Sequence, residues 1–229
     1  MNKIIGFCIV VVISYSSSAS GQTSIKETAA LVEKGKSAKN NDDDNTALIY
    51  FTKAIKLNPK NSEAYENRAM LYVKTRMDIE AITDFTQAIK LDPKSKESYY
   101  GRGECYASLN KNAESIADFT KNLELEPDND LAYIGRANAY INLKKFEEAI
   151  EDCIKAIEIN PKFAQPFFMR GYAYFESKKY REAITDFTQT IKLDPKNAGY
   201  YKNRSDIYKI LGDTKAADAD MAMYKKLSK

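Results

Sequence analysis

The sequence of 229 residues predicts an all-α fold, a solenoid of stacked helix-turn-helix repeats. Three observations lead to this prediction. Prolines recur at intervals of 34 residues, at Pro59, Pro93, Pro127, Pro161 and Pro195. The string AITDFTQAIKLDPK at 81–94 returns at 183–196 with a single change. Small and aromatic residues recur at fixed positions of the same period. A period of this length is typical of solenoids and helical arrays.

The first 21 residues have the three-part layout of a secretory signal peptide. A positive start at Lys3 leads into an apolar run, Ile4 to Ile13, and then into small residues ending near Ala19 to Gly21. This run is about half of the roughly 20 residues that span a bilayer. We therefore expect cleavage there, a short linker over 22–27, and a periplasmic or secreted protein without a stable membrane span. An uncleaved N-terminal anchor is the main alternative.

Repeats follow over residues 28–229, and each is predicted to contain two antiparallel helices of about a dozen residues. In the second repeat the helices are expected at Glu63 to Lys74 and Ile79 to Leu91. A proline after Asn or Asp ends the second helix, because proline lacks an amide and disfavours helix in the residue before it. The six predicted repeats are 28–61, 62–95, 96–129, 130–163, 164–197 and 198–229.

Fixed positions within the repeat carry fixed kinds of residue. The eighth and twentieth are small, as close helix contact requires, while aromatics dominate the fourth, eleventh and twenty-fourth, which share one helical face. With proline at the thirty-second position, this pattern resembles the tetratricopeptide repeat over 28–229. The resemblance implies a right-handed solenoid. Asn122, Thr190 and Tyr224 stand where the family prefers Ala, and the last repeat lacks the proline, so we expect looser packing there.

Two charge columns accompany the repeats. Arginine occupies the seventh position and aspartate the twenty-third in repeats two to six, whereas the first repeat has Lys34 and Tyr50 instead. Because both columns are lost together, we predict a structural series of Arg–Asp ion pairs between neighbouring helices; a ligand-binding row is the alternative. The residues are Arg68, Arg102, Arg136, Arg170, Arg204, Asp84, Asp118, Asp152, Asp186 and Asp220.

Composition argues against an enzyme and against nucleic acid as a partner. The chain has no histidine, the usual general base near neutral pH and the commonest metal ligand. Its 35 basic and 32 acidic residues are spread along the chain, without the basic stripe that follows phosphates. We expect no catalytic residue, no cofactor and no metal site. Cys105 and Cys153 are predicted to be separate core thiols, too few for a disulfide framework.

The acidic stretch NNDDDN, residues 40–45, starts like a calcium-binding loop. Counted from Asp42, however, the sixth position is Ala47 where an EF-hand needs Gly, and the twelfth is Lys53 where it needs Glu. We predict a solvated turn between two helices.

A stack of such hairpins presents a concave surface that binds partners. In the family that the chain resembles, the second, fifth, ninth, twelfth and thirteenth positions of the first helix line this groove. A chaperone-binding groove for a Glu-Glu-Val-Asp tail is not expected, because only Asn67 matches one of the five residues that it requires. The groove positions instead carry an apolar strip, predicted to bind a helix or hydrophobic peptide. Its residues are Tyr100, Ile134, Ile141, Phe168, Tyr172 and Phe175.

The sequence thus predicts an exported, non-enzymatic scaffold that holds a protein or peptide in its groove. Four alternatives remain open: an accessory subunit that recruits an envelope enzyme or assembly machine, a membrane-anchored repeat protein, a self-assembling structural protein, and an enzyme that uses Tyr, Lys and carboxylates. Against binding, the strip could simply pack on itself.

Overall fold

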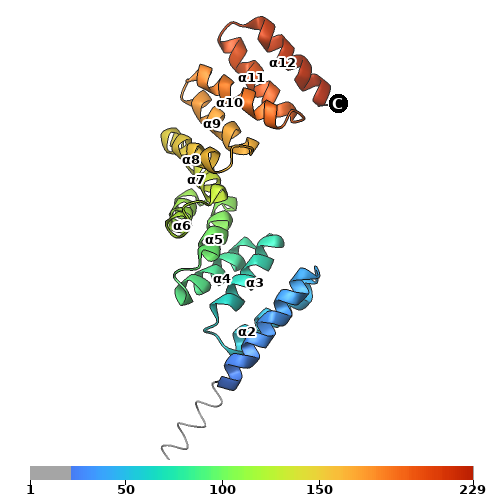
Figure 1. Ribbon diagram of the computed structural model, residues 1–229, viewed down its shortest axis with the longest axis vertical. Coiled ribbons are helices and arrows are strands. Elements are labelled where there is room, and N and C mark those ends of the chain that lie inside the picture. The colour runs from blue at the N-terminus through green and yellow to red at the C-terminus, as the bar shows by residue number, and fades with distance from the viewer. Residues whose placement is uncertain (1–21, 229) are drawn as a thin grey trace, which may run out of the picture. The chain divides into compact units, whose positions relative to one another are not determined.

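A computed structural model describes residues 22–228, and every regular element in this range is a helix (Figure 1). The all-α helical-repeat prediction is therefore confirmed. The predicted signal peptide, residues 1–21, lies outside the described residues. A first helix covers 22–40. The others are α2 (Asp44–Leu57), α3 (Ser62–Lys74), α4 (Asp78–Leu91), α5 (Lys96–Ser108), α6 (Asn112–Leu125), α7 (Asp130–Asn142), α8 (Phe146–Ile159), α9 (Ala164–Glu176), α10 (Tyr180–Leu193), α11 (Ala198–Ile210) and α12 (Thr214–Leu227).

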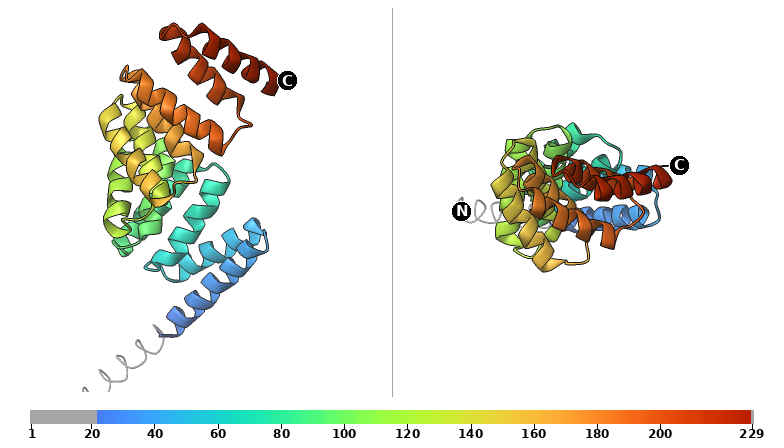
Figure 2. Two further views of the ribbon diagram at one scale, coloured as in Figure 1. Left: turned by 45° about the horizontal axis from the view of Figure 1, so that its top comes forward. Right: turned by 90° about the horizontal axis from the view of Figure 1, so that it is seen from above.

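Two compact units divide the chain, one ending at Cys105 and the other beginning at Tyr106. We call them the N-terminal and the C-terminal unit. Within the C-terminal unit, α7 packs on α8, α9 on α10, and α11 on α12, while α8 also packs on α9 and α10 on α11. Figure 2 shows the last of these hairpins in red, with α11 and α12 side by side and antiparallel. The hairpins therefore stack on their neighbours in sequence, as a solenoid requires.

Polar caps set the helix ends. Asn61, Asn129 and Asn197 precede α3, α7 and α11, and each side-chain oxygen accepts a hydrogen bond from a backbone N–H in the first turn. Such a cap satisfies an amide that has no partner within the helix. At the other end, Asn58 and Asp92 take extended backbone conformations immediately before their prolines, which ends α2 and α4.

The turn inside each hairpin repeats with the sequence period. The residue two places before the second helix has a positive φ in every repeat: Asp42 57°, Arg76 61°, Asn110 57°, Lys144 59°, Lys178 60° and Gly212 78°. Only the last is glycine, the residue that occupies this left-handed region without steric cost. The hairpin geometry therefore imposes this conformation, and side chains such as Lys144 and Lys178 tolerate it at a cost.

Phenylalanine at the twenty-fourth position forms the centre of the core. Phe51, Phe85, Phe119 and Phe187 are all at most 1% exposed. Such burial stabilises the fold by roughly 1.5–3 kcal/mol for each side chain. Gly101 lies over the ring of Phe85 and Gly135 over that of Phe119, so closely that a β-carbon at either glycine would overlap the ring. The rings of Phe85 and Phe119 thus fill space that a glycine leaves in the first helix of the next repeat, whereas the residue at that position is Asn67 after Phe51 and Asn203 after Phe187.

Two details near the N-terminus concern the predictions there. Residues 22–27, expected to be a linker, are helical and continue into the first helix, so that prediction is wrong. Exposed residues such as Lys26 and Glu27 suit a helix surface as well as a linker, and the sequence did not separate the two cases. The acidic stretch does form a turn: the Asp43 carboxylate caps α2 at Thr46, and Lys74 pairs with the Asp44 carboxylate at 2.7 Å.

Within residues 22–228, no helix is long and apolar enough to cross a membrane. The same part of the chain contains no cluster of acidic or cysteine residues arranged to hold a metal ion. Cys105 and Cys153 are both buried and free.

Candidate functional site

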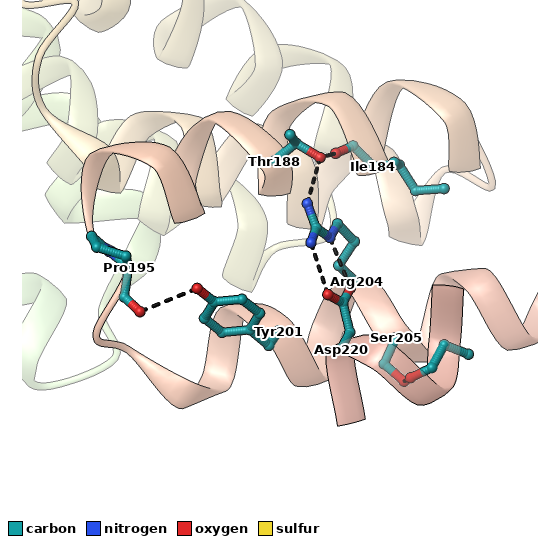
Figure 3. A network of polar contacts seen from close by, with 8 residues as sticks. Ile184, Thr188, Pro195, Tyr201, Arg204, Ser205 and Asp220 are labelled. Carbon is teal, nitrogen blue, oxygen red and sulfur yellow. Dashed lines mark hydrogen bonds and ion pairs between the residues drawn. The ribbon is translucent and has the colours of Figure 1, made fainter. Parts of the chain in front are cut away.

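The charge columns meet in a repeated arrangement that we call a rung. In each rung an arginine on the first helix donates two hydrogen bonds to an aspartate on the second helix of the same repeat. The Arg204 guanidinium, for example, reaches both Asp220 carboxylate oxygens at 2.8 Å (Figure 3). Three other pairs have the same two-bond geometry: Arg68–Asp84, Arg136–Asp152 and Arg170–Asp186. Arg102 and Asp118 belong to different units, so that pair stays a prediction.

A threonine from the preceding repeat joins most rungs, and the sequence reasoning missed it. Arg204 Nη1 donates to the Thr188 hydroxyl at 2.8 Å, so one guanidinium connects two repeats (Figure 3). The same bond joins Arg68 to Thr52, Arg102 to Thr86 and Arg136 to Thr120. These threonines stand at the twenty-fifth position, a column that could have been read beside the aspartates.

Burial makes these pairs structural in character. The Arg136 side chain is 17% exposed and that of Asp152 is 6% exposed. The Arg136 guanidinium also lies 5.7 Å from the ring centre of Tyr133, within cation–π range. Burial raises the pKa of the Asp152 carboxyl above its ordinary value, and the hydrogen bonds from Arg136 oppose this shift. A guanidinium so enclosed has few donors left for a ligand.

The predicted apolar strip is divided between the two units. Tyr100 lies in the N-terminal unit, where its hydroxyl donates to the Glu104 carboxylate at 3.0 Å. The other five residues lie in the C-terminal unit on α7 and α9. A surface built from all six residues therefore stays a prediction, and the candidate site is the part on the C-terminal unit.

Some residues of the strip serve the core after all. Ile134 is 6% exposed and belongs to the main apolar cluster of the C-terminal unit, and Ile141 packs against that cluster. Phe168 is half-buried and lies 5.8 Å from the ring of Phe187 and 5.2 Å from that of Tyr200. Ile134 and Phe168 thus contribute to the core although they stand at groove positions, which is the alternative of a strip that packs on itself. Ile134 packs with residues of α8 and α9, and Phe168 packs against rings of α10 and α11.

Tyr172 and Phe175 remain available on the surface. Tyr172 is 37% exposed, and Phe175 is half-buried with its ring 6.1 Å from that of Tyr180. Together with Phe187, Asn203 and Asp206 they line a pocket of about 70 Å³ between α9 and α11. Small-molecule clefts are commonly about 300–1,000 Å³. A pocket of this size holds one side chain of a larger partner.

Charged groups fix the rim of this pocket. Lys202 and Lys209, one turn to either side, donate to the Asp206 carboxylate at 3.2 Å each. Burial of Asp206 acts to raise its pKa, but the two lysines outweigh it and the pKa is lowered. Burial and the neighbouring Glu176 raise the pKa of Tyr172, so its hydroxyl stays protonated and can donate. Asn203 and Asp206 were not among the predicted site residues, although Asp206 occupies a groove position of the last repeat.

A second, polar pocket of about 400 Å³ lies in the N-terminal unit, between the first helix and α3. Lys36, Lys39 and Asn67 are among its lining residues. Lys36 is already engaged by the Glu33 and Glu63 carboxylates at 2.6 and 2.7 Å. The charge of Lys36 is therefore neutralised by carboxylates of the protein itself, and this polar pocket lacks the aromatic side chains that line the pocket between α9 and α11.

Comparison with known proteins agrees with this geometry. Family models described as tetratricopeptide repeat match residues 28–61, 50–83, 80–124, 131–163 and 164–197. Among proteins with curated descriptions, none matches the chain.

Several solved structures share the fold. YrrB, described as a TPR protein with an unusual peptide-binding site, is 22% identical with a TM-score of 0.69, over 77% of this chain and 91% of that one. PilW, described as a type IV pilus biogenesis factor, is 22% identical with a TM-score of 0.72, over 87% and 92%. PilF of Pseudomonas aeruginosa is 14% identical with a TM-score of 0.72, over 90% and 93%. Identities this low show the shared fold alone.

Proposed function

Because this chain belongs to the tetratricopeptide repeat family, we propose that it is an exported, non-enzymatic scaffold that holds a peptide segment of another protein. The binding surface is the part of the groove formed by α9 and α11. Stacked hairpins of this kind present preformed surfaces and act as interaction scaffolds. A preformed surface binds without first being ordered, which lowers the cost of association.

One observation carries the proposal: the aromatic pocket at Tyr172 and Phe175 is open, while Phe168, the other aromatic residue of the strip on the C-terminal unit, packs against Phe187 and Tyr200. An exposed tyrosine over an apolar floor, with charged groups around it, is the arrangement of a hot spot. Its size fits one apolar side chain, such as those that an amphipathic helix or an extended peptide presents. YrrB, which has the same fold, is described as having a peptide-binding site, and this supports the partner class.

The experiment is affinity capture with the chain from residue 22, from an envelope fraction of the source cells. Tyr172→Ser should reduce capture by roughly 30-fold, the equivalent of about 2 kcal/mol for a hot-spot residue. Leu143→Ser is the matched control, because Leu143 is similarly exposed at 42% but lies in the turn after α7. Equal capture by the Tyr172 and Leu143 variants would refute the site.

Phe168 is a poor probe of this site, although the sequence alone points to it. It packs against Phe187 and Tyr200, so replacing it with Ser should destabilise the C-terminal unit by about 3 kcal/mol or more. A loss of binding would then report unfolding. Tyr172 separates the two effects.

A second candidate is an accessory role in building an envelope machine. It is favoured by the likeness to PilW and PilF, each matched over about nine-tenths of its length. In this case capture should recover several subunits of one assembly in fixed proportion. Recovery of a single partner would favour the simpler scaffold.

A further inference from the structure

One rung of the C-terminal unit is incomplete. Arg170 donates to both Asp186 carboxylate oxygens at 2.8 and 2.7 Å, as in the other rungs. The twenty-fifth position of the preceding repeat, however, is Ile154 where its counterparts are Thr52, Thr86, Thr120 and Thr188. Arg170 Nη1 consequently has no hydrogen-bond partner among residues 22–228. Figure 3 shows a complete rung, in which the Thr188 hydroxyl accepts a hydrogen bond from Arg204 Nη1.

A shallow surface cavity of about 590 Å³, open to solvent, lies beside Arg170, and Ile154 is not among the residues that line it. Arg170 lines it together with the apolar side chains of Pro161, Phe167 and Ile184, and with the polar side chains of Thr185, Asp186, Thr188 and Gln189. The side-chain amide of Gln189, like Arg170 Nη1, has no hydrogen-bond partner within the described part of the chain. The cavity shares no lining residue with the aromatic pocket between α9 and α11.

We infer that this vacant rung is a second binding site, for a peptide segment that places the hydroxyl of a serine or threonine on Arg170. The partner hydroxyl supplies the acceptor that threonine supplies in the other rungs, while Ile154 itself stays packed against the apolar cluster of the C-terminal unit. A hydroxyl is the group that Nη1 meets in the Arg68, Arg102, Arg136 and Arg204 rungs, at 2.8–3.3 Å. The Gln189 side chain can donate a hydrogen bond to the backbone of the same peptide segment or accept one from it. The apolar side chains of Pro161, Phe167 and Ile184 can cover the aliphatic atoms of the peptide.

The charges around Arg170 favour a neutral hydroxyl over an anionic group as the ligand. Asp186 is 3% exposed, lines the same cavity and already neutralises Arg170 through two hydrogen bonds. A phosphate or carboxylate would meet this buried carboxylate as well as the guanidinium. A hydroxyl adds a hydrogen bond to a charged donor without adding charge. Phosphorylation of the partner residue should therefore weaken binding.

The test uses two substitutions of Ile154 that have nearly the same shape. Ile154→Thr supplies the missing hydroxyl and completes the rung, whereas Ile154→Val shortens the side chain equally without supplying a hydroxyl. A displayed library of random linear peptides is selected on the Ile154→Val chain, with free Ile154→Thr chain as competitor. If the site binds a hydroxyl as proposed, Ser or Thr should recur at one position of the selected peptides. Their affinity should also fall about tenfold on Ile154→Thr, the value of a hydrogen bond to a charged group.

Three further measurements on the selected peptides make the outcome decisive. Tyr172→Ser should leave their affinity unchanged, which separates this site from the proposed groove and leaves the groove hypothesis standing if this one fails. Replacing the recurrent Ser or Thr by Ala should lower affinity, and phosphorylating it should lower affinity further. Equal binding to the Ile154→Thr and Ile154→Val chains, an absence of selected peptides, or stronger binding after phosphorylation would each overturn the inference.

Discussion

Replacing Arg136 with Met tests whether a rung stabilises the repeat stack. The substitution keeps the aliphatic stem but leaves the Asp152 side chain, 6% exposed, without its guanidinium, and it removes the bond to Thr120. Breaking a buried ion pair from one side costs roughly 3–5 kcal/mol. Because the Arg136 side chain is 17% exposed and water can reach the vacated space, we expect the lower end, about 3 kcal/mol.

The assay is thermal unfolding followed by circular dichroism. For a chain of this size, about 3 kcal/mol corresponds to a fall in Tm of roughly 6–12 °C. Arg181→Met is the control, because Arg181 is exposed near the start of α10 and should leave Tm unchanged. The double variant Arg136→Met with Asp152→Leu should recover most of the loss, because no buried charge is then left without a partner. A Tm for Arg136→Met within about 1 °C of the parent would refute a stabilising role.

The pH dependence of that variant gives a second check. Burial raises the folded-state pKa of Asp152, and without Arg136 nothing opposes this shift. A carboxyl whose folded pKa is raised favours the folded state below its unfolded pKa, and this contribution is lost as pH rises through the folded value. The loss of unfolding free energy in Arg136→Met, relative to the parent chain, should therefore be smallest at about pH 4 and largest at about pH 7. A deficit independent of pH would contradict the account of Asp152.

Three other predictions follow from the fold. Gly135→Ala should lower the free energy of unfolding of the C-terminal unit by about 1–3 kcal/mol in urea titrations, because its β-carbon overlaps the Phe119 ring; a neutral effect would mean that the ring moves freely. Lys178→Gly should raise stability by about 0.5–1 kcal/mol in the same assay, because Lys178 has φ 60°, and a loss would show that its side chain matters more than its backbone. Burial raises the pKa of the Cys105 and Cys153 thiols to about 12. Both should therefore resist alkylation at about pH 8 until the chain is denatured, and rapid labelling of the folded chain would contradict their burial.

The sequence predicts the fold well because the same type of residue recurs at the same position in several repeats. A phenylalanine at one position of one block is ambiguous, but Phe51, Phe85, Phe119 and Phe187 at the same position identify a buried column. The Arg and Asp columns predicted the pairs in the same way. Residues 22–27 fall outside the repeat, and there the prediction of a linker was wrong.

The candidate site was harder to predict, because it depends on how neighbouring helices pack. The groove positions of the family include both Phe168 and Tyr172, and nothing in their residue types says that one turns inward and the other remains exposed. That distinction arises from the contacts of Phe168 with Phe187 and Tyr200. Similarly, the vacant rung at Ile154 is visible in the sequence as a missing threonine, but its meaning depends on the bond that the other threonines form.

Site-specific photo-crosslinking in the source cells tests the central claim most directly. A photoreactive phenylalanine analogue replaces Tyr172 in one chain and Arg181, an exposed residue of α10, in another. We predict a crosslinked adduct of one defined mass from position 172 and none from position 181. Adducts of the same mass from both positions, or from position 181 alone, would contradict binding at the α9–α11 pocket.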